Sequence, residues 1–201
     1  MVHEHKTTAV RQKEIALAAR RLIIKRGAEH LTVRSIAEDV GISESAIYRH
    51  FRSKQDILCL LLDDIERNLI DDIDMERRSA DTSLGTVDGV LRHHLSRLEQ
   101  RRGIRFQVIA EIISLGDKTL NRRAYDTVQK YIARMRQLLL DGMETGTIRK
   151  DIDSTAAATL LFSIVQGVVN VWALSNYGFD PVAQYEPMWQ IVRQAIEVPR
   201  D

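Results

Sequence analysis

The side chains best suited to binding chemistry lie close together between residues 43 and 54. Five polar residues there follow an i, i+1, i+4, i+5, i+8 pattern, which places them on one face of a helix. They are Glu44, Ser45, Tyr48, Arg49 and Arg52. This face supplies a hydroxyl, a carboxylate, guanidinium groups and a phenol, the groups that contact base edges and phosphates in nucleic acids. The opposite face carries Ala46, Ile47 and Phe51, so we expect the helix to dock its apolar side on a core.

Two short helices joined by a tight turn are predicted around this face. Thr32 is a candidate N-cap for the first helix, which runs to Val40. Ser43 is a candidate N-cap for the second, from about Glu44 to Phe51. Gly41 lies between them and suits the left-handed conformation that ends one helix and turns the chain into the next.

A longer helix flanks the short pair on each side. Residues 10–26 have the spacing of an amphipathic helix, and Gly27 supplies its end. Ser53 and Asp56 resemble a capping box that opens a long fourth helix. Two short helices braced in this way form a helix-turn-helix unit, so the pattern predicts a DNA-binding domain over residues 1–54 and a second domain over residues 55–201.

Ten ordered positions within residues 32–54 carry a resemblance to a known family. They are Thr32, Ile36, Ala37, Gly41, Ser43, Tyr48, His50, Phe51, Ser53 and Lys54. The segment resembles the DNA-binding domain of the tetracycline-repressor (TetR) family. In that family a Thr opens the second helix, a Gly-(Val/Ile)-Ser turn precedes the recognition helix, and Tyr-x-(His/Tyr)-Phe followed by Ser/Thr-Lys closes the unit.

The resemblance implies that this segment binds a double-stranded DNA operator. The predicted DNA contacts are Thr32, Arg34, Ser43, Glu44, Ser45, Tyr48, Arg49, His50 and Lys54. Thr32 and Lys54 are the expected clamps on the DNA backbone. Ser45 and Glu44 depart from the family pattern, in which Gly or Lys is common at these positions. The Glu44 carboxylate would repel phosphate unless it faces a cytosine amino group or solvent.

Charge and composition agree with two regions of different function. Residues 1–54 carry 11 Lys and Arg against 6 Asp and Glu, a net charge of +5, whereas the remainder carries 18 against 22, a net charge of −4. A basic first segment suits a polyanion, although a membrane surface or simple solubility would also account for it. A composition of 44% hydrophobic and 28% charged residues can form a sizeable core and excludes an intrinsically disordered protein. The single cysteine and the absence of an apolar leader at the start indicate the cytoplasm.

The rest of the chain predicts an all-α second domain, for about nine helices in total. Further helices are expected over residues 84–100, 104–115, 117–143, 154–176 and 182–197, with glycines and one proline between them. The run 154–179 contains no charged residue and is long enough to span a bilayer. A line of polar residues along it and acidic flanks favour a helix buried on most sides that also lies in a subunit interface, and not a membrane span.

The second domain is expected to form a homodimer and to hold a small-molecule effector. A single helix-turn-helix makes few base contacts, so a pair of them reading a palindrome would gain specificity. Candidate interface residues are Leu161, Ile164, Val168, Trp172, Trp189 and Val192, although the two tryptophans fit an intrachain core equally well. Candidate effector contacts are polar or aromatic residues on apolar helices: Phe106, Gln107, Glu111, Tyr125, Phe162, Gln166 and Asn170.

No enzyme chemistry is indicated by the residue pattern. The chain lacks a phosphate-binding glycine loop, a nucleophile elbow and histidines, cysteines or carboxylates at metal-ligand spacing, so no cofactor, metal or catalytic residue is predicted. Three hypotheses remain open: a ligand-responsive repressor, a DNA-bound interaction protein of the nucleoid-occlusion type, and a helical enzyme or scaffold that contains a helix-turn-helix-like corner.

Overall fold

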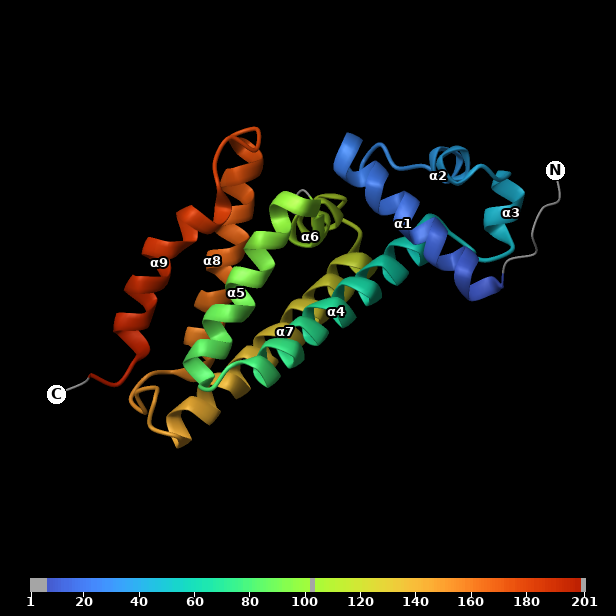
Figure 1. Cartoon of the computed structure of the whole chain (residues 1–201). Coiled ribbons are helices and arrows are strands. Elements are labelled where there is room, and N and C mark those ends of the chain that lie inside the picture. Colours follow the sequence, from blue (N-terminus) through green and yellow to red (C-terminus); the bar gives the residue numbers. More distant parts are fainter. Residues whose placement is uncertain (1–6, 102–103, 200–201) are drawn as a thin grey trace. The chain divides into compact units, whose positions relative to one another are not determined.

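The structure, a computed structural model, describes the backbone of residues 7–101 and 104–199 and the side chains of residues 7–96 and 108–199. This part of the chain contains nine α-helices (Figure 1). In chain order they are α1 (Thr8–Arg26), α2 (Val33–Val40), α3 (Glu44–Tyr48), α4 (Lys54–Ser79), α5 (Ser83–Arg101), α6 (Ile104–Ser114), α7 (Lys118–Glu144), α8 (Ser154–Leu174) and α9 (Pro181–Ile196). Within the described ranges the only β-type pairing is an isolated bridge between Ile148 and Glu197. The predicted all-α class is confirmed.

The chain divides into two compact units. Unit 1 comprises the residues up to Ile65 together with Gln107–Thr127. Unit 2 comprises Glu66–Phe106 and the residues from Val128 onward. The helices α4, α6 and α7 therefore each contribute residues to both units.

Local hydrogen bonds set the helix ends in unit 1. The Thr32 hydroxyl accepts the N–H of Ser35 at 3.0 Å, and the Ser35 hydroxyl accepts the N–H of Thr32 at 3.1 Å. This reciprocal capping box begins α2. Gly41 ends it at φ 75°, a left-handed conformation that a side chain would strain. The predicted turn between the two short helices is therefore present.

The second short helix is shorter than predicted. The expected helix ran to Phe51, whereas α3 ends at Tyr48. The N–H groups of both His50 and Phe51 donate to the Ile47 carbonyl, at 2.8 and 3.0 Å, which tightens the last turn. Phe51, just beyond the end of the helix, is only 7% exposed and therefore still packs in the core, as its place on the apolar face predicts.

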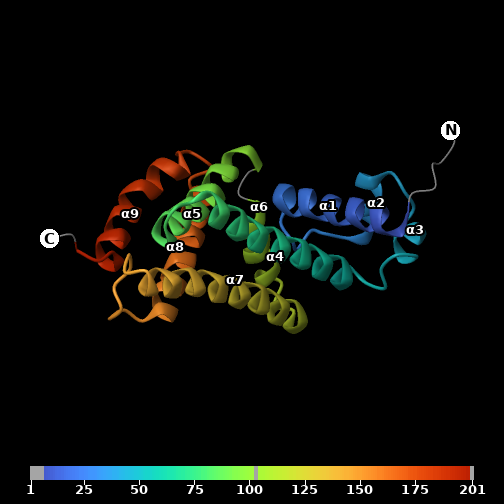
Figure 2. The ribbon, with the colours of Figure 1, turned by 60° about the horizontal axis from the view of Figure 1, so that its bottom comes forward.

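Unit 2 is a bundle of long helices tied by ion pairs. Figures 1 and 2 both show α5, α8 and α9 side by side, in agreement with their mutual contacts. The Tyr185 hydroxyl of α9 donates to Asp88 of α5 at 2.9 Å, and Arg92 bridges Asp88 to Glu186. These polar contacts fix α9 against α5 at the edge of an apolar core.

The apolar helix α8 is less buried than its composition predicts. By length and composition it could cross a membrane, yet only 33% of its most apolar stretch is buried in this chain. Leu160, Val171 and Leu174 are exposed on it, and Ile191 is 70% exposed on the adjacent α9. The chain itself thus covers only part of α8, and the expected burial of the remainder in a subunit interface stays a prediction. An apolar surface shared by α8 and α9 is left open.

Candidate nucleic-acid interface

The short helix α3 separates a buried side from an exposed side within a single turn. The Ser43 hydroxyl accepts the N–H of Ala46 at 3.2 Å and lies 2.9 Å from the Ser45 hydroxyl, so both serines stand at the start of the helix. Ile47 is fully buried, whereas the next residue, Tyr48, is 54% exposed. The phenol and the hydroxyls therefore face solvent on a helix that its apolar side holds in place.

Lys54 lies at the start of α2 as well as at the start of its own helix. Its ammonium group donates to the Leu31 carbonyl at 3.1 Å, the residue directly before the cap Thr32. The long-range hydrogen bond brings a positive charge to the positive end of the α2 dipole, where an anion would be attracted. Thr32 and Lys54, predicted from separate positions in the sequence, are thus brought together.

Gln12 supports α3 from the first helix, and sequence reasoning did not identify it. Its side-chain amide donates to the His50 carbonyl at 3.3 Å, just beyond the end of α3. The Nδ1 atom of His50 is buried and has no hydrogen-bond partner among the described residues. Gln12 lies in a run of polar residues on α1, between Arg11 and Lys13, so the sequence does not distinguish it from its neighbours and helical periodicity alone gives it no partner.

The charged residues of α2 and α3 are exposed. Arg34 donates to Glu38 at 3.0 Å, although its side chain stays 77% exposed. Arg49 and Glu44 are exposed as well. The surface around α3 therefore offers exposed guanidinium groups together with one carboxylate at the start of the helix.

The predicted effector residues are distributed over both units. In unit 1, the Glu111 carboxylate accepts the N–H of Ala28 at 3.2 Å, and Tyr125 is 62% exposed. In unit 2, the Phe162 ring lies 5.9 Å from that of Tyr131. Gln166 and Asn170, also in unit 2, are hydrogen-bonded to each other at 3.0 Å. The side chains of Phe106 and Gln107 lie outside the described residues.

The predicted interface residues lie mainly inside the chain. Five of them are no more than 6% exposed in the single chain: Leu161, Val168, Trp172, Trp189 and Val192. Ile164 is half-buried. Both helices are present as predicted. The exposed apolar residues on them stand at other positions than the predicted ones, because α8 and α9 each carry apolar residues on two faces and only one face packs inside the chain.

Comparison with protein families shows what kind of protein this chain is. Residues 15–59 match the tetR family of bacterial regulatory proteins, and residues 63–195 match the family described as YsiA-like protein, C-terminal region. The second match alone covers more than half of the chain. The chain belongs to the TetR family. It is a DNA-binding transcriptional regulator with a helix-turn-helix in its N-terminal region, and its family and structural neighbours are regulators.

The similarity to curated relatives and to solved structures covers most of this chain, at least 90% in each of the four examples below. The nucleoid occlusion factor SlmA of Idiomarina loihiensis is 24% identical over 186 residues, 92% of this chain and 95% of the relative. SlmA of Vibrio cholerae is 25% identical over 188 residues, with 93% and 96% covered. The fatty acid degradation regulator FadR of Bacillus halodurans has a TM-score of 0.82 at 22% identity, with 94% and 96% covered. FadR of Bacillus subtilis, solved with stearoyl-CoA, has a TM-score of 0.81 at 21% identity, covering 90% and 96%.

Proposed function

We propose that this TetR-family regulator is a cytoplasmic, ligand-responsive repressor that binds a palindromic operator as a homodimer. The observation that carries the proposal is the two-sided character of α3. Its buried Ile47 fixes the helix, and its exposed Tyr48 is free to reach bases. A narrow helix with one polar face fits the major groove, where each base pair presents a distinct pattern of donors and acceptors.

The groups around α3 are suited to holding the DNA backbone. Thr32 and Lys54 meet at the start of α2, and the Arg34 side chain is exposed nearby along the same helix. In this proposal the two positively charged side chains neutralise phosphates, and Ser43, Ser45 and Tyr48 contact base edges. The support from Gln12 at the end of α3 would hold the helix in a constant orientation.

Selection of bound duplexes from a random pool tests the DNA contacts. We expect a two-fold-symmetric consensus with half-sites about one helical turn, roughly 34 Å, apart. Tyr48→Ala should weaken binding to the selected duplex by about tenfold or more. Tyr125→Ala is the matched control, because Tyr125 is equally exposed but lies on α7. A selection without symmetry, or equal affinities of the two variants, would refute the assignment.

The open apolar surface of α8 and α9 supports a homodimer of this regulator. Leu160, Val171, Leu174 and Ile191 would be covered by the same residues of a second copy, as isologous interfaces require. Leu160→Glu should convert the dimer to a monomer in sedimentation equilibrium, because the charge would be buried against an apolar partner. Ile113→Glu, at an exposed position of α6, should leave the dimer intact. A Leu160→Glu protein that remains dimeric contradicts this surface.

Effector control is supported by what related structures contain. FadR of Bacillus subtilis was solved with stearoyl-CoA, and a regulator from Saccharomonospora viridis was solved with choline. A small molecule that binds the free protein better than the DNA-bound protein would release the operator. Screening of a metabolite library for release of the selected duplex tests this. The proposal fails if none of the compounds releases the duplex and none of them changes expression from the operator.

A second candidate is a DNA-bound protein whose output is contact with a partner protein. It is favoured by the names of the curated relatives, which are nucleoid occlusion factors at 23–25% identity. Release of the operator by a small molecule would favour the repressor. Recruitment of a protein partner by the intact protein–duplex complex, with no response to small molecules, would favour this alternative.

A further inference from the structure

The carboxylate of Glu44 stands at the start of the helix that carries the proposed base contacts. Glu44 is the first residue of α3 and is exposed. It lies one helical turn before Tyr48, and residues four apart share one face of a helix, so both belong to the exposed side of α3. The hydroxyls beside it are engaged with other groups. Ser43 caps the N–H of Ala46 at 3.2 Å, and the hydroxyl oxygens of Ser43 and Ser45 lie 2.9 Å apart.

Glu44 differs from the other acidic residues of the first three helices. Three further carboxylates lie on α1 and α2, and each pairs with an arginine of unit 1. The pairs are Glu14 with Arg11 at 2.9 Å, Glu38 with Arg34 at 3.0 Å and Asp39 with Arg21 at 2.5 Å. In the part of the chain that the structure describes, the Glu44 carboxylate has no hydrogen-bond or ion-pair partner. One negative charge on the exposed side of α3 is therefore left without compensation.

A local role for this charge follows from its place in the helix. A carboxylate in the first turn is attracted by the positive end of the helix dipole. However, α3 has only five residues, and the Ser43 hydroxyl already fills its N-cap position. A local role would change the stability of the helix but would give no preference for one base over another. A base preference therefore distinguishes a DNA contact from a capping role.

An uncompensated carboxylate on this face is costly when the helix meets DNA. A duplex carries one negative charge per about 1.7 Å of its axis, so a carboxylate that enters a groove is repelled by the phosphates on both sides. The first residues of a recognition helix are those that contact base edges. The charge of Glu44 is therefore tolerated where a base edge donates a hydrogen bond to it, and it disfavours sequences that offer no such donor.

Cytosine is the base whose major-groove edge suits a carboxylate. Only adenine N6 and cytosine N4 carry amino donors in that groove, whereas guanine presents two acceptors and thymine presents an acceptor and a methyl group. In adenine the amino group stands beside the N7 acceptor, whose lone pair would repel the carboxylate. Cytosine presents its amino group with no acceptor on its own edge, so it gives a carboxylate a donor without this repulsion.

We propose that Glu44 is a specificity-determining residue, whose carboxylate accepts a hydrogen bond from the N4 amino group of one cytosine in each operator half-site. The inference rests on the proposed function, because Glu44 reaches a base only if α3 enters the major groove. It adds the identity of one base and the residue that selects it. A different base at this position leaves the carboxylate unpaired among phosphates, so the duplex is bound more weakly.

Selection of bound duplexes by the full-length protein and by its Glu44→Ala variant tests the base preference. The wild-type consensus should contain a cytosine, at one position of each half-site, that Glu44→Ala no longer selects. Replacement of this C·G pair by T·A puts an acceptor in place of the amino donor. It should weaken wild-type binding by about tenfold or more and Glu44→Ala binding by less than about twofold. A symmetric consensus whose cytosines are all retained by Glu44→Ala overturns the inference and leaves the proposed function standing.

Two further variants separate this contact from a change in net charge. Glu29→Ala removes a carboxylate outside α3 whose side chain is 60% exposed, and it should still select the cytosine. Glu44→Gln keeps the length of the side chain and should admit adenine, because an amide pairs with adenine N6 and N7. Loss of the cytosine in Glu29→Ala as well would assign the effect to net charge and overturn the inference. If the wild-type protein selects no duplex, the proposed function itself fails.

A chemically modified duplex identifies the donor atom. A methyl group on N4 of the selected cytosine retains the pair with guanine but removes the amino hydrogen that faces the major groove. Wild-type affinity should fall by about tenfold, the factor that one charge-assisted hydrogen bond supplies, whereas the affinity of Glu44→Ala should be unchanged. Equal effects of the methyl group on the two proteins would show that Glu44 does not accept from this atom, and the inference would be wrong.

Discussion

The polar residues around α3 in unit 1 and those between α4 and α5 in unit 2 have different roles. In unit 1 hydroxyl groups cap short helices, as Thr32 and Ser43 do, and the polar face of α3 is left to solvent. In unit 2 the charged groups connect long helices. His93 of α5, for example, lies 3.4 Å from Asp72 and 3.3 Å from Glu76, both on α4.

The packing of α5 against α4 shows how far unit 2 depends on such contacts. A Cβ atom at Gly89 would lie 2.7 Å from the Glu76 carboxylate, so this glycine leaves the space that lets Glu76 approach α5. The short helix α3 is held instead by buried apolar groups such as Ile47 and by the hydrogen bond from Gln12 to the His50 carbonyl. The comparison teaches that the exposed side of a short helix can be left to solvent when its buried side provides the packing, whereas the long helices of unit 2 are joined to each other by charged side chains.

The largest expected effect separates the two faces of α3. Ile47→Ala should lower the free energy of unfolding by about 2–5 kcal/mol, because a fully buried side chain is truncated. Tyr48→Ala should change it by only about 0.5 kcal/mol, since the side chain is exposed. Urea denaturation measures both. Similar losses of unfolding free energy in the two variants would show that Tyr48 contributes to the packing of α3 as much as Ile47 does.

Next in size is the loss of a tie between long helices. Tyr185→Phe removes the hydrogen bond to Asp88 and should lower the free energy of unfolding by about 1–3 kcal/mol, because a bond from a buried phenol to a charged, half-buried carboxylate is lost. Tyr125→Phe is the control at an exposed position. Thermal unfolding followed by circular dichroism measures both. If the two variants are equally stable, the polar contacts of unit 2 do not contribute as argued.

Helix caps in the two units should have equal cost but different functional consequences. Thr32→Ala and Asp180→Ala each remove an N-cap and should lower the free energy of unfolding by about 1 kcal/mol. Only Thr32→Ala should also weaken binding to the selected duplex, since Asp180 lies at the start of α9. Equal duplex affinities of the two variants would remove Thr32 from the DNA contacts.

The smallest effect concerns the pH dependence of unit 2. The N–H groups of Ala156 and Thr155 stabilise the Asp153 carboxylate and hold its pKa below the ordinary value of 3.8. Because the pKa is lower in the folded state, this contribution is present above the ordinary value and is lost as the pH falls through the folded-state pKa. Asp153→Asn should therefore flatten the decline in unfolding free energy measured from about pH 5 to about pH 2. An unchanged decline would contradict the capping role.

Features that depend on neighbours along the chain could be predicted from the sequence. The caps Thr32 and Ser43, the turn at Gly41 and the length of most helices follow from hydrogen bonds and periodicities that span only a few residues. The burial of Phe51 was predicted from the apolar face of the helix, whereas the end of α3 was predicted three residues too late, because helical periodicity continues past Tyr48 and does not mark where the backbone leaves the helix.

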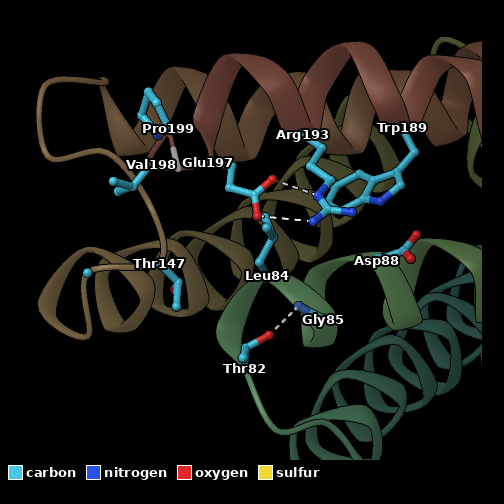
Figure 3. Close-up of a pocket in the computed structure, with 11 residues that line it drawn as sticks. Thr82, Leu84, Gly85, Asp88, Thr147, Trp189, Arg193, Glu197, Val198 and Pro199 are labelled. Atoms are coloured by element: carbon cyan, nitrogen blue, oxygen red, sulfur yellow. Dashed lines mark hydrogen bonds and ion pairs between the residues drawn. The ribbon is translucent and has the colours of Figure 1, made fainter. Parts of the chain in front are cut away.

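Contacts between distant segments could not be predicted in the same way. The hydrogen bonds from Gln12 to His50 and from Lys54 to Leu31 join residues 38 and 23 positions apart. A helical period indicates that a residue is polar or apolar, but not which group lies opposite. A hollow in unit 2 lined by Leu84, Thr147 and Trp189 has the same origin, since α5, α9 and the turn at Gly146–Thr147 meet there only after folding (Figure 3).

The amino-acid pattern was sufficient for the all-α class, the helix-turn-helix and its exposed polar face, because these depend on helical period and local capping. Folding in three dimensions selected which apolar side of α8 is covered by its own chain, leaving Leu160 and Val171 exposed while Leu161 and Val168 are buried. It also assembled the hollow lined by Leu84, Thr147 and Trp189. Both outcomes depend on how helices far apart in the chain pack, and burial is a property of that packing and not of any one segment.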